Sequence, residues 1–127
     1  RTGSFTSTDI ELQSVEMDGS LTQTPEFPYN WMYDGSRPQM PGFEMEITCK
    51  SLFLIFKDSG EMDVGKADVF VNDVYCMTAD PHKNNWLHCN AVLLFWETES
   101  RSHKVRITVT EEDQNKKFTI LGFGYTI

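Results

Sequence analysis

Two polar and aromatic segments hold the residues best suited to binding chemistry. In the first, Tyr29, Trp31 and Tyr33 occupy alternating positions, so an extended backbone presents all three rings on one side. Aromatic rings stack on the apolar face of a sugar, while amides and carboxylates hydrogen-bond its hydroxyl groups. The segment is a candidate stacking platform. The alternative is that the same rings close one end of a hydrophobic core.

The second segment, residues 80–90, places one tryptophan among amides, imidazoles and a carboxylate. We expect Trp86 to stack on a sugar ring while four neighbours hydrogen-bond its hydroxyls, namely Asp80, Asn85, His88 and Asn90. The alternative is a structured connection in which these side chains satisfy backbone groups.

Metal binding is a further alternative, either of zinc by nitrogen and sulfur ligands or of calcium by oxygen ligands. The zinc-type ligands are His82, His88, Cys89 and Cys76, whose spacing matches no common structural zinc motif. The oxygen ligands are Asp58, Glu61 and Asp63, which lack the EF-hand pattern. We therefore expect no cofactor and no metal ligands, with a structural Ca²⁺ left as the open alternative.

Catalytic motifs are absent from the sequence. There is no G-x-S-x-G elbow, and no glycine-rich phosphate loop follows an expected strand. His88 and Cys89 are adjacent, so on a strand their side chains point to opposite faces and cannot form a dyad. We expect no catalytic residues and a binding domain rather than a stand-alone enzyme.

The elements that must position these residues are strands. Blocks rich in Val, Ile, Phe and Thr alternate with polar turns and predict strands at 43–49, 51–56, 67–72, 74–77, 91–96, 104–110 and 118–125. Block 51–56 is apolar on both faces and predicts a central strand, and block 91–96 predicts another buried strand. Asn72 with Asp73 predicts a tight hairpin. The proline-rich first forty residues predict loops and short edge strands, including a strand near residues 10–17. The pattern favours an all-β, antiparallel two-sheet β-sandwich of jelly-roll type with seven to nine strands and short helical turns at most.

Composition bounds the partners and the location. The 127 residues fit one domain, 1–127, and a missing initiator Met and leader suggest a piece of a longer multidomain protein. A formal charge of -8 argues against nucleic acid, and no apolar run approaches the roughly 20 residues that span a membrane. Three cysteines cannot all pair, so at least one thiol is free. Free thiols are compatible with an intracellular location, whereas a polysaccharide partner implies an extracellular one.

Four stretches resemble the β-sandwich accessory domains of SGNH (GDSL-like) carbohydrate esterases from anaerobic gut and rumen Firmicutes. They are residues 62–73, 85–90, 103–109 and 118–125, within a resemblance covering residues 5–127. This chain has Asn72 and Asp73 where the family usually has Asp-Gly. The resemblance implies a non-catalytic module beside an enzyme that deacylates plant-wall polysaccharide in a secreted bacterial protein.

Two functions therefore compete. The first is a monomeric carbohydrate-binding module that holds a β-glucan or hemicellulose on its aromatics and raises the local substrate concentration for a tethered catalytic domain. The second is a structural accessory domain that packs on an esterase without a ligand of its own. The first predicts exposed aromatics, and the second predicts buried ones.

Overall fold

The computed structural model describes residues 5, 30–35, 42–58, 62–82 and 89–127, and all structural statements below concern these residues. They form six strands and one 3-10 turn: β1 (Trp31–Tyr33), β2 (Phe43–Lys57), β3 (Ala67–Val71), β4 (Val74–Ala79), β5 (Cys89–Val109), η1 (Glu111–Asp113) and β6 (Phe118–Thr126). The all-β prediction is confirmed. The expected strand near residues 10–17 lies outside the described residues.

All six strands belong to one antiparallel sheet, in the order β1-β6-β2-β5-β3-β4. A sandwich of two sheets is therefore not confirmed in the described part of the chain, where one sheet contains every strand. Blocks 43–49 and 51–56 are one strand, β2, and blocks 91–96 and 104–110 are one strand, β5. The predicted breaks disappear because the two strands pair on both sides of them, with Cys49 opposite Arg101 and Ser51 opposite Trp96.

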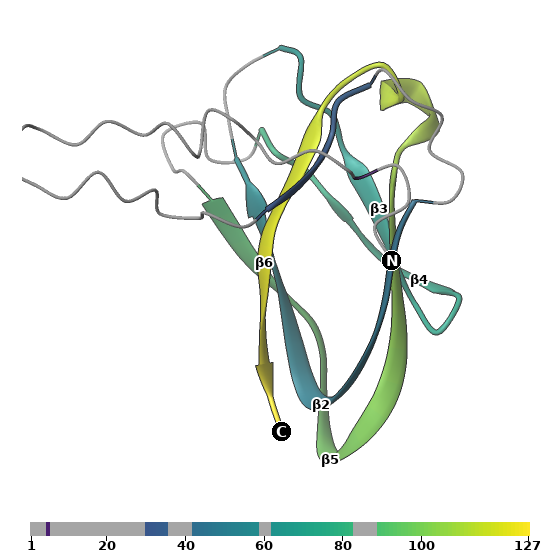
Figure 1. Ribbon diagram of the computed structural model, residues 1–127, viewed down its shortest axis with the longest axis vertical. Helices are drawn as coiled ribbons and strands as arrows, with labels where there is room; N and C mark the ends of the chain where they lie inside the picture. The colour runs from purple at the N-terminus through teal and green to yellow at the C-terminus, as the bar shows by residue number, and fades with distance from the viewer. Residues whose placement is uncertain (1–4, 6–29, 36–41, 59–61, 83–88) are drawn as a thin grey trace, which may run out of the picture.

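The two long strands fold back on themselves, as the lower part of Figure 1 shows. The β2–β5 ladder shifts register between Cys49 and Ser51 and again between Leu52 and Phe53, and such bulges bend a strand. One sheet thereby supplies two facing layers. Layer A contains β1, β6 and residues 51–57 and 89–96. Layer B contains β3, β4 and residues 43–49 and 101–109.

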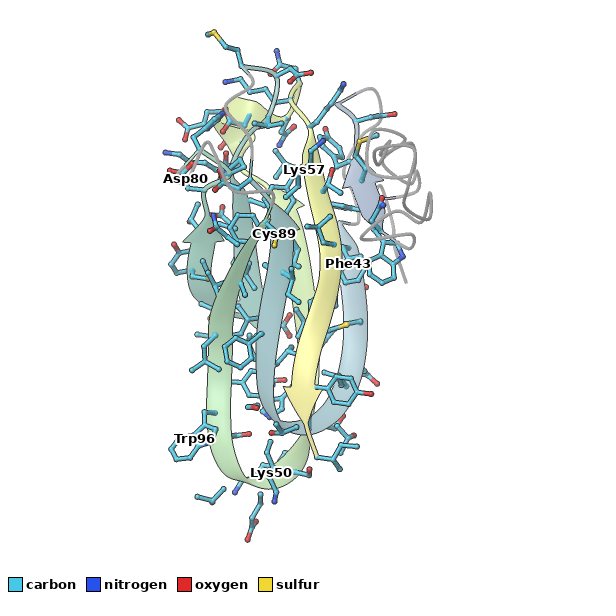
Figure 2. All side chains as sticks on the ribbon, turned by 90° about the vertical axis from the view of Figure 1, so that its left-hand side faces the viewer. Phe43, Lys50, Lys57, Asp80, Cys89 and Trp96 are labelled. Carbon is cyan, nitrogen blue, oxygen red and sulfur yellow. The ribbon has the colours of Figure 1, made fainter. Side chains whose placement is uncertain are left out.

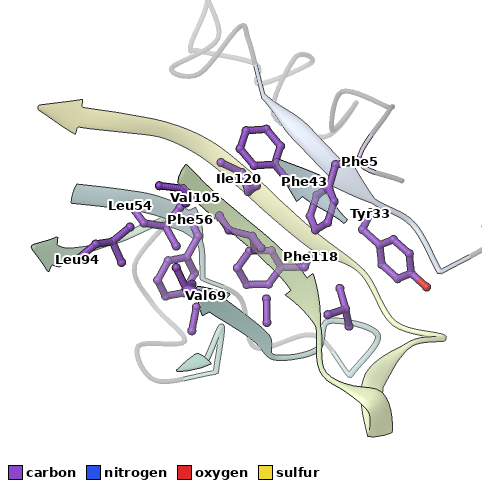
Figure 3. Close-up of a cluster of buried hydrophobic side chains, with 14 of the residues drawn as sticks. Phe5, Tyr33, Phe43, Leu54, Phe56, Val69, Leu94, Val105, Phe118 and Ile120 are labelled. Atoms are coloured by element: carbon purple, nitrogen blue, oxygen red, sulfur yellow. The ribbon is translucent and has the colours of Figure 1, made fainter. Parts of the chain in front are cut away.

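The hydrophobic core lies between the layers (Figure 3). Alternate residues of β2 in layer A, Leu52, Leu54 and Phe56, are buried, as are those of β5 in layer B. Each such Leu, Val or Phe side chain contributes roughly 1.5–3 kcal/mol on burial. Aromatic contacts join the layers, including Phe43 with Phe123 at a ring-centroid separation of 5.7 Å.

The β3–β4 hairpin confirms the prediction made from Asn72 and Asp73. Both residues have positive φ, 51° and 65°, as a two-residue type I′ turn requires. Val71 pairs with Val74 across the turn. Asn and Asp tolerate this left-handed backbone better than most residues, so the hairpin closes without glycine.

All three thiols in the structure are free. In the part of the chain that the structure describes, no helix is long and apolar enough to span a membrane.

Candidate functional site

The first sequence-predicted platform belongs largely to the core. Tyr33 is 2% exposed, its ring lies 5.8 Å from that of Phe5, and its hydroxyl donates to the backbone carbonyl of Gln114. Burial, with a smaller contribution from Asp34, raises the pKa of this hydroxyl. The ring of Tyr33 therefore takes the core-closing role, which leaves it no open face for a sugar.

Trp31 precedes Tyr33 by two residues on β1 and joins the same aromatic group. It is half-buried, and its ring centroid lies 5.4 Å from Phe43 and 6.4 Å from Phe123. Trp31 thus closes the gap between the layers at the side where β1 and β6 run. Tyr29, the third member of the predicted platform, lies outside the described residues.

The second predicted cluster is described only at its two ends. Asp80 follows β4, and its carboxylate closes a local turn by accepting the backbone N–H of His82 at 3.0 Å. Asn90, on β5, donates from its amide to the carboxylate of Asp58, which is 4% exposed. Both side chains therefore satisfy local polar groups. The other members, Asn85, Trp86 and His88, lie outside the described residues.

Metal ligands do not gather in the described residues: no group of three or more His, Cys, Asp or Glu there could hold an ion. Of the calcium alternative, Asp63 lies 3.2 Å from the ammonium group of Lys117, and Asp58 pairs with Asn90. Glu61 is outside the described part.

A chain of hydrogen bonds centred on the buried His103 crosses the fold-back of β5. The Oδ1 atom of Asn72 accepts the Lys104 N–H at 3.0 Å, which turns its Nδ2 toward the Nδ1 of His103 at 2.9 Å. Because an amide nitrogen only donates, Nδ1 accepts, and the Nε2–H of His103 donates to Glu97 at 2.6 Å. Glu97 and His103 lie on opposite arms of the bend in β5. The hydrogen bonds from Asn72 through His103 to Glu97 therefore hold the two layers together.

The thiols of Cys49 and Cys76 are weak nucleophiles. Burial raises the pKa of Cys49, and the negative charge of Glu97 adds to that effect. Burial also raises the pKa of Cys76. Because the thiolate is the reactive form, these two cysteines behave as small core residues.

The outer face of layer B carries a pocket of about 700 Å³ that the sequence analysis missed. We call it the Asp68 pocket, and its lining contains hydroxyls, carboxylates and one ammonium group: Lys66, Asp68, Thr78, Thr110, Glu111 and Glu112. Asp68 and Thr78 are cross-strand partners on β3 and β4. The Thr78 hydroxyl donates to the Asp68 carboxylate at 2.7 Å, so the carboxylate is oriented before any ligand binds.

Tyr75 extends the hydrogen-bonded pair of Asp68 and Thr78 into a row of three side chains. The Tyr75 hydroxyl lies 2.7 Å from that of Thr78, and the Tyr75 side chain is 57% exposed. Its ring meets the edge of Phe70 at 6.0 Å, and the Arg106 guanidinium lies 4.2 Å above the Phe70 ring. Phe70 and Arg106 thus hold Tyr75 in place beside the pocket.

The signal for this site was present in the sequence as alternation. In β3, residues 67, 69 and 71 face the core, so Asp68 and Phe70 share the outer face with Tyr75 and Thr78. Regular pairing of β3 with β4 from the confirmed turn places Tyr75 opposite Phe70 but Met77 opposite Asp68. Thr78 becomes the partner of Asp68 only through the register shift between Val69 and Phe70, which the sequence does not indicate. The contribution of Thr110 and of η1 depends on β5 lying next to β3, which the sequence does not indicate.

A second surface lies on the outer face of layer A. The prediction that 91–96 is a buried strand is wrong, because Leu93 is 52% and Trp96 74% exposed. Phe53, opposite Leu93, is 40% exposed. A strand that is apolar on both sides buries both only when layers cover both, and the described strands supply no layer beyond A and B.

Comparisons with known proteins give one structural match. No protein-family model matches the chain, and no curated protein sequence matches it. Among solved structures, the chain is similar to a two-domain esterase active on acetylated mannans, crystallised with mannopentaose, at a TM-score of 0.46 and 12% identity. The match covers 79% of this chain and 37% of the esterase chain. The present chain therefore spans little more than a third of that esterase.

Proposed function

We propose that this domain is a non-catalytic carbohydrate-binding module that holds an uncharged plant-wall polysaccharide in the Asp68 pocket. The observation that carries the proposal is the row of Tyr75, Thr78 and Asp68, in which an exposed ring continues through two hydrogen bonds into the pocket.

The chemistry of the row suits a sugar. Sugar hydroxyls both donate and accept hydrogen bonds, and the pocket offers acceptors in its carboxylates, donors in Lys66 and both in its threonines. The exposed ring of Tyr75 offers the flat apolar surface on which the C–H groups of a sugar ring pack. A few convergent polar groups beside an aromatic wall are typical of small-molecule sites.

Charge selects among sugars. Three carboxylates and one ammonium group line the pocket, so a uronic acid meets net repulsion whereas an uncharged hemicellulose or β-glucan does not. In a longer protein, a module of this kind would keep a tethered enzyme near its polysaccharide and raise the local substrate concentration.

Affinity gels test this function. We expect the chain to be retarded by at least one of soluble xyloglucan, mixed-linkage β-glucan, xylan or glucomannan. Replacing Tyr75 by Ala or Asp68 by Asn should weaken binding of the matching oligosaccharide roughly fivefold or more, the equivalent of about 1 kcal/mol. Tyr125→Ala is the matched control, because Tyr125 is 55% exposed and lies on β6.

Two results contradict the proposal. The first is no retardation by any uncharged polysaccharide, which favours an accessory domain without a ligand. The second is binding that survives Tyr75→Ala and Asp68→Asn while both variants keep the wild-type unfolding midpoint.

A further inference from the structure

The outer face of layer A has an uncharged area that crosses three strands and is bounded at one end by Lys57, two residues beyond Ile55 on β2. The register aligns three cross-strand rows, which together we call the Trp96 face: Trp96, Ser51 and Thr126; Leu93, Phe53 and Gly124; Ala91, Ile55 and Gly122. Figure 2 looks onto this layer, with Trp96 projecting from β5 near the fold-back, where Lys50 also lies. None of the nine residues is ionisable.

Within the described residues, neither backbone conformation nor close packing requires glycine at the two glycine positions of this face. Neither has positive φ, since Gly35 is the glycine with that conformation among the described residues. Among the described residues, a Cβ added at Gly122 meets nothing within 4 Å, and one at Gly124 meets the Cβ of Phe53 at 3.8 Å, an ordinary contact. Gly122 also lies beside the register shift of the β2–β6 ladder between Ile55 and Phe56. Glycine weakens a strand. Its effect here is on the outside, where it leaves β6 flat beside the rings of Phe53 and Trp96.

The size of the face limits its occupant. Three strands about 4.8 Å apart and three rows about 6.7 Å apart give a footprint on the order of 300 Å². A stable protein–protein interface needs about 800 Å² from each partner, so the face is too small to hold a second copy of the chain by itself. A single extended polymer chain needs only a narrow strip of surface, and the footprint of this face is large enough for that.

We infer that the Trp96 face binds an extended, unbranched, uncharged polysaccharide lying flat on the sheet. This inference builds on the proposed carbohydrate-binding function but does not use the Asp68 pocket. Trp96 and Phe53 stack on the apolar faces of successive sugars, and Gly122 and Gly124 let the polymer lie flat against β6. The pocket opens on layer B and this face on layer A, so one domain binds polysaccharide on two opposite sides.

Sedimentation with insoluble polysaccharide tests the inference. We expect the chain to bind microcrystalline cellulose or insoluble linear mannan, and Trp96→Ala to weaken that binding roughly fivefold. Gly122→Thr adds a side chain where there is space for it. It should keep or raise the unfolding midpoint, because threonine suits a strand better than glycine, and yet weaken sedimentation similarly.

Variants of the other surfaces separate this site from the pocket. Tyr75→Ala and Asp68→Asn should lose soluble oligosaccharide but still sediment with the insoluble polymer. Val74→Ala, at an exposed position of the β3–β4 hairpin, should change neither. If the pocket fails and the face binds, the proposed site of the function is wrong while this inference stands.

Three results would overturn the inference. The wild-type chain does not sediment with any insoluble polysaccharide; or Trp96→Ala and Gly122→Thr bind like the wild type; or analytical ultracentrifugation finds a dimer that Trp96→Ala dissociates. The last result assigns the face to contact between copies of the chain.

Discussion

Asp113, in η1, shows how one carboxylate ties the end of layer B together. Its Oδ2 atom accepts the backbone N–H of Lys66 at 2.9 Å, and its Oδ1 atom lies 3.4 Å from the Lys116 ammonium group. The Lys66 hydrogen bond is the main reason that the pKa of Asp113 lies below its ordinary value of 3.8, with burial acting in the opposite direction. These contacts hold η1 beside the Asp68 pocket.

A pH dependence follows from this lowered pKa. Because the folded state has the lower pKa, ionised Asp113 stabilises the fold above pH 3.8, and this contribution is lost as the pH falls through the folded value. Asp113→Asn should therefore be less stable than the wild type by about 1 kcal/mol near neutrality, with the difference shrinking in acid. Urea unfolding at a series of pH values measures it.

The neighbouring Glu112, which is exposed, provides the comparison. Glu112→Gln should follow the wild-type curve. A stability difference for Asp113→Asn that stays constant from neutral to acid pH would disprove the assignment of the lowered pKa to this carboxylate.

At the scale of elements, the decisive feature is the fold-back of β2 and β5. The hydrogen-bonded chain from Asn72 through His103 to Glu97 clamps it, and the ring of Phe95 packs 4.1 Å from that of His103. The clamp also attaches the β3–β4 turn to β5, since the Asn72 N–H donates to the Lys104 carbonyl at 2.8 Å.

Asn72→Gly tests the clamp while keeping the turn. Glycine adopts the positive φ of this position, and its backbone N–H remains, but the side-chain bonds to Lys104 and His103 are lost. Since His103 is 7% exposed, its Nδ1 is left without that partner, at a cost of about 1–3 kcal/mol in unfolding free energy. Chemical denaturation measures this loss.

Asp73→Gly is the matched variant in the same turn, at a φ of 65°. It should stay within about 0.5 kcal/mol of the wild type, as surface substitutions usually do. Equal losses for the two variants would mean that the turn backbone, and not the Asn72 side chain, carries the effect.

Strand positions were largely predictable, and strand continuity was not. The alternation of residues 43–49 and 104–110 indicated which residues face the core, and the structure agrees. Lys50 and residues 97–103 look like breaks because they are polar. They remain in strands because the opposite strand supplies hydrogen bonds on both sides of the bend.

At the scale of the whole molecule, the net charge predicts which polysaccharides the proposed sites can bind. The chain carries a formal charge of -8. It therefore repels anionic polysaccharides, most strongly at low ionic strength. The chain should therefore not bind polygalacturonate. Binding of the uncharged polysaccharide should change little when salt is raised to about 1 M, where the Debye length is about 3 Å.

Affinity gels at low and high salt check this behaviour. Retardation by polygalacturonate at low salt that disappears at high salt would show a cationic binding surface, which contradicts the preference for uncharged sugars.

The sequence by itself determined the strand-rich fold, the hairpin at Asn72 and Asp73, and the acidic surface, because alternation, turn chemistry and charge are local properties of the chain. Only the tertiary structure decided which aromatic rings are covered. Tyr33, predicted as part of a platform, is in the core, whereas Trp96, predicted as buried, is on the surface. The physical reason is that alternation separates the two faces of a strand, but the partner layer selects which face loses water.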